Sequence, residues 1–319
     1  MHEGKKDLTA HRPLVAVDFP ISSRKLRVFF NELFIAPKLR KLHFSVLLDG
    51  SLDHIVDGEA LTAGLGAQAS SGLPALEELV YYVDDDYSRQ LGGLRSALSG
   101  DVKRLCACPQ LRVVDLSYAN VHGDLRVFAC MPGLAELRLL QCGDMEGDID
   151  CLKELKRLRI LEVDGANIHG SIAALGGGSG LTDLAELNLN STKVNGNVSG
   201  LSRLVHLTVL DLNDTQVQGD ITGLSSLTQL VELHLSRTLI EGDVVGLSEL
   251  LALMVLDLSG TQAQGKATDL RQLGNLTDLS IYGTQIQDDT SEYSGDPALQ
   301  AALLLAQQQT PPPAPPLHS

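Results

Sequence analysis

The chain has 319 residues, of which 44% are hydrophobic and only 4% aromatic, and it contains no Trp. Its formal net charge of −15 argues against DNA or RNA as a partner, because nucleic-acid affinity comes mostly from Lys and Arg neutralising phosphates. A basic protein or peptide is the more natural partner for such an acidic chain. No apolar run approaches the roughly 18 residues of a membrane span.

Residues 1–36 are predicted to form an N-terminal cap. The segment from Ser23 to Phe34 has the spacing of an amphipathic helix, which would cover leucines at the open end of a repeat array. No apolar run of signal-peptide length follows the charged first residues. The five cysteines, between Cys106 and Cys151, are odd in number and form no terminal pairs. A cytoplasmic location is therefore expected.

Residues 37–97 are interpreted as two degenerate repeats. The segments that begin at Pro37 and Pro74 match the segment that begins at Pro109 closely enough to be equivalent strands. The interval from Tyr81 to Gly100 is longer than the regular one, which indicates a loop inserted near 83–93.

Residues 98–290 contain regular units of 23 residues. One unit reads Leu201, Leu204, Leu207, Leu210, Leu212, Thr215, Val217, Gly219 and Ile221, and the series restarts at Leu224. The apolar spacing changes from 3 to 2, which predicts a short strand with alternate side chains buried. Stacked units would pair these strands into one parallel sheet. The connecting half is too short for a long helix and is expected to be 3₁₀ or irregular, with insertions near Gly143 and Gly176 in surface loops.

These residues resemble the leucine-rich-repeat family, in the Leu-x-x-Leu-x-Leu-x-x-Asn-x-Leu-x-Gly-x-Ile form of plant receptor ectodomains. Thr stands where the family has Asn, as at Thr215 and Thr238, and the Pro after Ile is missing. The resemblance implies an α/β leucine-rich-repeat solenoid that is curved and right-handed, with a parallel β-sheet on its concave face. The family name carries a fold and does not carry one function.

The best candidate binding residues are the solvent-facing positions of the strands, which should stack into columns. The first column is predicted to include Asp115, Arg138, Glu162, Asn188, Asp211, His234 and Asp257, the second Asp164 and Tyr282, and the third Asp214 and Arg237. They form a mildly acidic surface with few of the Trp, Tyr and Arg anchors that usually carry binding energy. A merely solvated face is the alternative interpretation.

Other patterns favour structural roles. The Asp residues that follow the repeat glycine, such as Asp220 and Asp243, are simpler as turn residues than as a metal site. Cys106 and Cys108 lack a second pair at zinc-finger spacing, and Cys142 occupies the inward Thr position. The Thr column is predicted to point inward and to hydrogen-bond the backbone. We expect no metal, no cofactor and no catalytic group.

After the repeats, Asp296 and Pro297 look like the start of a capping helix within 291–308. Residues 309–319 are Pro-rich and are expected to be disordered, with weak potential to bind a polyproline-reading domain.

The sequence thus predicts a non-catalytic protein-interaction module, a scaffold or regulatory subunit whose concave face binds a protein. Two alternatives stay open. One is an extracellular receptor-type ectodomain, prompted by the N-x-Ser/Thr triplets at Asn190, Asn197, Asn213 and Asn275. The other is an accessory recognition domain of a larger enzyme.

Overall fold

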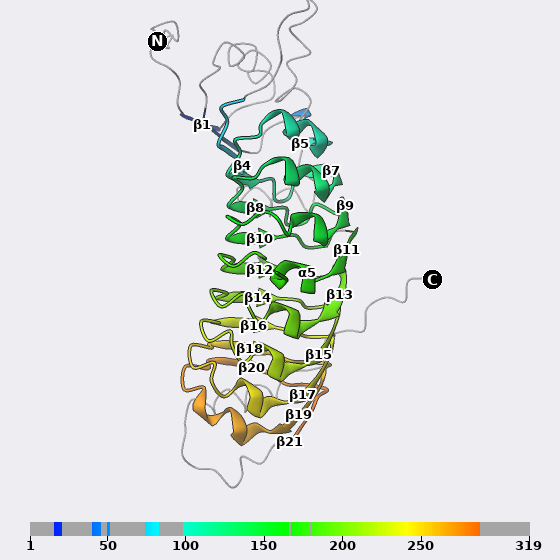
Figure 1. Cartoon of the computed structure of the whole chain (residues 1–319), viewed down its shortest axis with the longest axis vertical. Coiled ribbons are helices and arrows are strands. Elements are labelled where there is room, and N and C mark those ends of the chain that lie inside the picture. The colour runs from blue at the N-terminus through cyan, green and yellow to red at the C-terminus, as the bar shows by residue number, and fades with distance from the viewer. Residues whose placement is uncertain are drawn as a thin grey trace, which may run out of the picture.

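A computed structural model shows a stack of short strands and short helices (Figure 1). The structure describes residues 16–20, 40–45, 50–51, 74–82 and 98–287, apart from 166 and 179. The predicted N-terminal helix, the inserted loop near 83–93, the C-terminal helix and the Pro-rich tail lie outside these residues.

The Leu-x-x-Leu-x-Leu segments form one parallel sheet, as predicted, and we call it sheet A. It has 11 strands in chain order. They are β1 (Ala16–Pro20), β2 (Lys41–Ser45), β4 (Glu78–Tyr82), β6 (Val113–Asp115), β8 (Glu136–Arg138), β10 (Ile160–Glu162), β12 (Glu186–Asn188), β14 (Val209–Asp211), β16 (Glu232–His234), β18 (Val255–Asp257) and β20 (Asp278–Ser280). Strands β2 and β4 fall in the two segments interpreted as degenerate repeats, and β1 falls within the predicted cap segment and pairs with β2.

A second parallel sheet, sheet B, was not predicted. It has 10 strands from the Gly-containing half of each unit. They are β3 (Gly50–Ser51), β5 (Leu98–Asp101), β7 (Asn120–Asp124), β9 (Asp144–Asp148), β11 (Asn167–Ser171), β13 (Lys193–Asn197), β15 (Gln216–Asp220), β17 (Leu239–Asp243), β19 (Gln262–Lys266) and β21 (Gln285–Gln287). The alternation in Gln216-Val217-Gln218, with Val217 buried between exposed Gln side chains, is the strand signal that the repeat pattern concealed.

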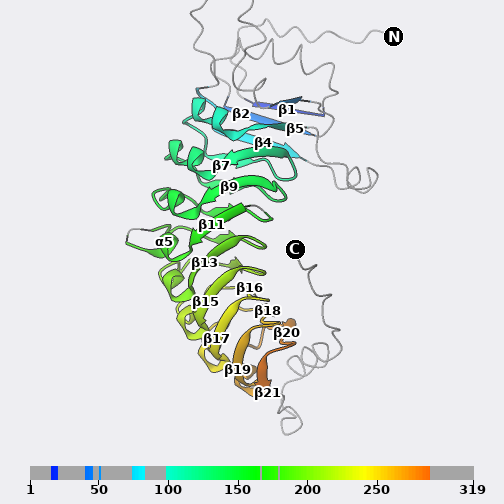
Figure 2. The same ribbon diagram turned by 90° about the vertical axis from the view of Figure 1, so that its right-hand side faces the viewer.

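Short helices complete the units, and seven of the eight helices within the described residues are 3₁₀ helices, as the short connections predicted. They are η1 (Val102–Ala107), η2 (Leu125–Cys130), η3 (Ile149–Leu152), η4 (Val198–Leu201), η5 (Ile221–Leu224), η6 (Val244–Leu247) and η7 (Ala267–Gln272), with α5 (Ala173–Gly176) as the α-helical one. The extra residues near Gly176 continue α5 into a surface loop, where Gly177 and Gly178 are exposed. Figure 2 shows the stack bowed, with the helices on the outer side and sheet A on the inner side.

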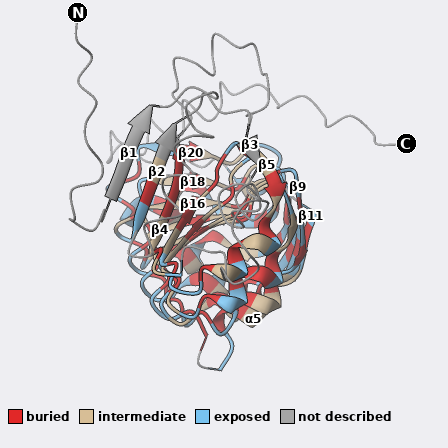
Figure 3. Cartoon of the chain, turned by 90° about the horizontal axis from the view of Figure 1, so that it is seen from above, coloured by how far each residue is buried: buried red, intermediate tan, exposed pale blue. Residues whose placement is uncertain are grey.

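One continuous aliphatic core runs through the stack. Seen along the stack, the buried residues lie between the two sheets and the helices (Figure 3). Leu207, Leu210 and Leu212 are fully buried, as are their equivalents in neighbouring units. Because a single 23-residue unit cannot enclose such residues, stacking supplies the core.

The threonine column points into this core, as predicted. Thr192, Thr215, Thr238 and Thr261 are buried, and each hydroxyl donates to the carbonyl three residues before it at 2.6–2.7 Å. These bonds stay within one repeat and do not form a ladder between repeats. Cys142, at the equivalent position, is also buried.

Candidate binding face

The inner face of sheet A presents two rows of side chains, because alternate residues of a strand point to opposite faces of the sheet. We call the third residue of each strand the trailing row: Asp115, Arg138, Glu162, Asn188, Asp211, His234, Asp257 and Ser280. The register of β6 through β20 places each of these residues beside the next, so the first predicted column exists.

Half of the trailing row has a local structural task. The side-chain oxygens of Asp115, Asn188, Asp211 and Asp257 accept hydrogen bonds from the backbone N–H two residues later at 2.9–3.0 Å. These bonds close the turn by which the chain leaves sheet A. Four of the predicted binding residues therefore also stabilise the repeat.

Arg138 forms a small charge network with its neighbours. It lies 2.6 Å from a carboxylate oxygen of Glu136 and 2.9 Å from one of Glu162. The side chain of Arg138 is 25% exposed and that of Glu162 is 20% exposed. Near β8 the face is therefore internally neutralised.

The predicted second and third columns lie at the turn that follows each strand. Tyr118, Asp214 and Arg237 have positive φ angles there. Arg237 lies 3.0 Å from a carboxylate oxygen of Asp214 in the preceding repeat. Asp164 accepts a hydrogen bond from Gln141, and the Tyr282 side chain is 45% exposed. Most of the residues predicted for the second and third columns therefore already contact a side chain or backbone group of an adjacent turn.

The first residues of the same strands form a leading row that the sequence interpretation did not select. It reads Val113, Glu136, Ile160, Glu186, Val209, Glu232, Val255 and Asp278. Acidic and β-branched apolar residues alternate along it without exception. The signal was present in the sequence as a period of two repeats, which a comparison of single repeats does not detect.

Together the two rows place one carboxylate on each of nine consecutive strands, β4 to β20. They alternate between the rows in the order Glu78, Asp115, Glu136, Glu162, Glu186, Asp211, Glu232, Asp257 and Asp278. Arg138 is the sole Lys or Arg within strands β6 to β20. The series of carboxylates ends at β4, where Glu78 lies 2.6 Å from Lys41.

Burial shifts the titration of two trailing-row carboxyls. Burial raises the pKa of Glu162, and Arg138 opposes this while Glu186 and Asp115 add to it. Burial also raises the pKa of Asp211, opposed by the Asn213 N–H and His234. The carboxylates on this face therefore repel one another, which favours a cationic ligand.

The Asp residues that follow the repeat glycine cap helices. Asp101, Asp124, Asp148, Asn197, Asp220 and Asp243 each accept the backbone N–H two residues later at 2.8–2.9 Å. They therefore have a structural role, but as helix N-caps at the ends of sheet B strands and not as the turn residues that the sequence predicted. Among the described residues no group of three or more His, Cys, Asp or Glu side chains could hold a metal ion, and no helix there could span a membrane.

No protein-family model and no curated protein match the sequence. Solved structures do. The plant peptide hormone receptor RGFR1 in complex with RGF2 has a TM-score of 0.56 and 20% identity, over 86% of this chain and 41% of that one. The Arabidopsis receptor kinase HAESA, in complex with the peptide hormone IDA and the co-receptor SERK1, has a TM-score of 0.56 and 23% identity, over 86% of this chain and 38% of that one. A TDR receptor has a TM-score of 0.57 and 19% identity, over 86% of this chain and 44% of that one.

The two sheets of stacked parallel strands and these similarities define a leucine-rich-repeat solenoid fold. The chain spans 38–44% of the length of the three receptors. At these identities the likeness concerns the fold.

Proposed function

We propose that the chain is a non-catalytic binding module whose sheet A face holds a cationic segment of a protein or peptide. The observation that carries this proposal is the single carboxylate on each of nine consecutive strands, with Arg138 as the sole Lys or Arg in strands β6 to β20. Such a surface attracts cations and disfavours anions. The predicted basic partner follows from the same charges.

The compared receptors support one part of this proposal, that the ligand is a peptide segment. Two of them are described in complex with peptide hormones, which shows that a leucine-rich-repeat scaffold can hold a peptide. The leading row adds Val113, Ile160, Val209 and Val255, which lie half-buried between the acidic residues. Apolar surface beside charge suits the aliphatic stems of Lys and Arg.

The test is selection of peptides from a random displayed library on the immobilised full chain. We expect enrichment of peptides with several Lys or Arg residues over the starting library. The enriched peptides should lose at least about tenfold in affinity for the variant Glu186→Lys, Glu232→Lys, Asp278→Lys, because like charges placed opposite each other repel. These positions are preferred to Asp211 and Asp257, whose side chains close turns.

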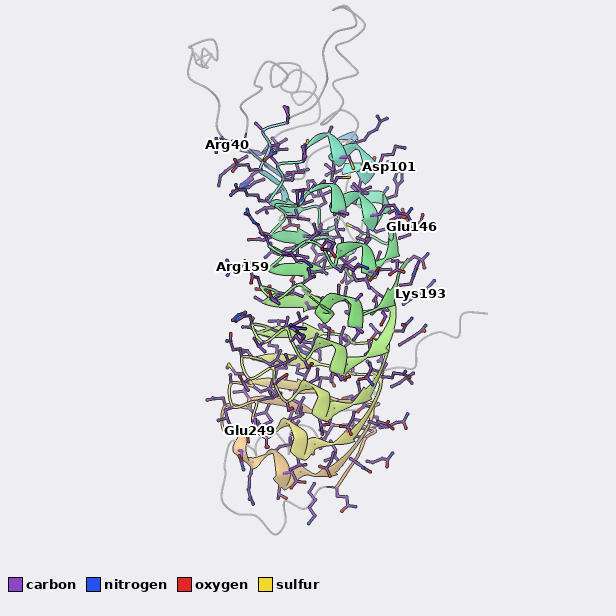
Figure 4. All side chains as sticks on the ribbon, in the orientation of Figure 1. Arg40, Asp101, Glu146, Arg159, Lys193 and Glu249 are labelled. Atoms are coloured by element: carbon purple, nitrogen blue, oxygen red, sulfur yellow. The ribbon has the colours of Figure 1, made fainter. Side chains whose placement is uncertain are left out.

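A charge-matched control separates local from general attraction. The variant Glu146→Lys, Glu154→Lys, Glu249→Lys has the same change in net charge at exposed sites away from the inner face of sheet A. Figure 4 shows Glu146 beside sheet B and Glu249 near the other edge of the stack. Equal losses in both variants, or enrichment without cationic residues, would overturn the proposal.

An extracellular receptor-type ectodomain is the second candidate, and it would replace the cytoplasmic location expected above. The compared structures include receptor-kinase ectodomains, and Asn275 in one glycosylation triplet is exposed on the structure. A mass increase at Asn275 that an N-glycosidase removes would support this candidate. Unmodified Asn275 in protein from the native cell would support the intracellular module.

A further inference from the structure

The leading row suggests which cationic segment fits, an inference that rests on the proposed function. Its carboxylates Glu136, Glu186, Glu232 and Asp278 stand on every second strand, β8, β12, β16 and β20. Between each neighbouring pair stands one apolar side chain. The row therefore repeats after two strands, and a ligand that fills it must repeat over the same distance.

Three of these leading-row carboxylates, Glu186, Glu232 and Asp278, are better placed for a ligand than the trailing-row ones, whereas Glu136 already lies 2.6 Å from Arg138. The Glu186 and Asp278 side chains have no hydrogen-bond or ion-pair partner among the residues that the structure describes. Glu232 is 46% exposed, and its neighbour His234 lies 3.6 Å away. Asp211, in contrast, already accepts the Asn213 N–H. A ligand can pair with the leading row without disrupting a turn.

Adjacent strands of a sheet lie about 4.8 Å apart, so the leading-row carboxylates follow one another at about 9.6 Å. A polyproline-II helix rises about 3.1 Å per residue and has three residues per turn, so the same face returns every 9.3 Å or so. In an extended β-strand, side chains point to the same side again after about 6.7 Å. In an α-helix, two turns bring side chains to the same face after about 10.8 Å. The polyproline-II repeat matches the row best.

We propose that the leading row binds a polyproline-II peptide segment with Lys or Arg at every third residue, lying along the stack. Four such cations span ten residues: three of them pair with Glu186, Glu232 and Asp278, and the fourth shares Glu136 with Arg138. Ile160, Val209 and Val255 contact the stems of the cationic side chains between them. Because polyproline II is largely preformed in proline-rich chains, binding loses little conformational entropy.

The match holds over the whole row. The difference between the two repeats is about 0.3 Å per interval, hence about 1 Å over the three intervals from Glu136 to Asp278. Long Lys and Arg side chains accommodate this difference. A β-strand with a cation at every second residue would be out of register by nearly 3 Å after one interval.

The experiment compares two peptides of identical composition on the full chain. The registered peptide is Arg-Pro-Pro-Arg-Pro-Pro-Arg-Pro-Pro-Arg, and the clustered peptide has two Arg, six Pro and two Arg. Fluorescence anisotropy at about 0.15 M salt, where the Debye length of about 8 Å suppresses long-range attraction, gives the two Kd values. We expect the registered peptide to bind at least about tenfold more tightly.

Two variants locate this preference. Glu186→Gln with Glu232→Gln removes two leading-row charges and keeps the shape of both side chains, and it should reduce the preference to less than about threefold. Asp211→Asn with Asp257→Asn removes two trailing-row charges and should keep the preference, because Asn188 shows that an amide oxygen accepts the same turn hydrogen bond.

The outcomes separate the two proposals. Equal affinity for both peptides would overturn the register and leave a cation-binding face intact. No binding of either peptide would overturn the basic partner as well. A preference that survives in Glu186→Gln, Glu232→Gln, or a stronger affinity for an α-helical peptide with four Arg at one-turn spacing, would overturn the leading row as a polyproline-II site.

Discussion

The capping carboxylate of Asp220 lies directly against Gly242 of the following repeat. A Cβ atom built on Gly242 would stand 2.4 Å from Asp220 Oδ1, and the φ angle of Gly242 is +99°. Gly170 and Gly265 meet the capping residues of their preceding repeats, Asp148 and Asp243, in the same way. The repeat glycine is therefore required both by backbone conformation and by the cap of its neighbour.

Gly242→Ala should lower the free energy of unfolding by about 2–3 kcal/mol, because it adds a strained φ angle and a steric clash. The loss should be smaller in an Asp220→Ala background, which itself lacks a cap and costs about 1 kcal/mol. Urea unfolding measures both values. Gly274→Ala is the control, since nothing lies within 4 Å of its Cβ position, and a similar loss there would contradict the explanation.

Thr238→Val should cost about 1–3 kcal/mol although the two side chains are similar in shape. The buried hydroxyl donates to the Leu235 carbonyl at 2.7 Å, and its removal leaves that oxygen without this partner. Thermal unfolding would show the loss. The exposed Thr182→Val should change the stability by less than about 0.5 kcal/mol, so equal effects at the two sites would refute this role.

Asp211→Asn should leave the stability at pH 7 equal to that of the parent chain or higher. Burial raises the pKa of Asp211 above its ordinary 3.8, so the folded chain holds this proton more tightly than the unfolded chain does. The stabilisation that this proton gives the folded chain is complete below pH 3.8, and it is lost as the pH rises through the pKa of Asp211 in the folded chain. Calorimetry should therefore show any advantage of Asn at pH 7 shrinking below pH 3.8, and an advantage that grows on acidification would contradict this reasoning.

Cys106 should react slowly with iodoacetamide although it is exposed. The residue is exposed as a whole, but partial desolvation of its sulfur and the neighbouring Cys130 raise the pKa of the Cys106 thiol to about 12, so the reactive thiolate is scarce at pH 8. Peptide mass spectrometry should show alkylation at least about tenfold slower than for a free cysteine peptide, and faster in Cys130→Ser. A rate equal to that of the peptide would show that the thiol has an ordinary pKa.

Most of the fold could be predicted from the sequence because the same residue pattern recurs in each repeat. The change of apolar spacing located sheet A, and the short connection between Gly219 and Leu224 predicted the 3₁₀ helices. Sheet B was missed because Asp220, directly after Gly219, was interpreted as a turn residue. The structure shows Gly219 inside a strand with a φ angle of +108°.

The binding face was predicted less completely than the fold. The trailing row was found, but the turn bonds of Asp115 and Asp257 depend on backbone geometry that spacing alone does not give. The leading row was overlooked because its order appears only when two repeats are taken as one unit. Glu186 and Glu232, its central acids, were therefore not selected.

Photo-cross-linking tests most directly whether the inner face of sheet A is the binding surface. Benzoylphenylalanine would replace Val209 in the leading row, or Val245, which is 50% exposed in η6 on the outer side. Irradiation with the registered Arg-Pro-Pro peptide should give a covalent adduct from position 209 and none above background from position 245. An adduct from position 245 alone, or equal yields from both positions, would contradict binding on the inner face.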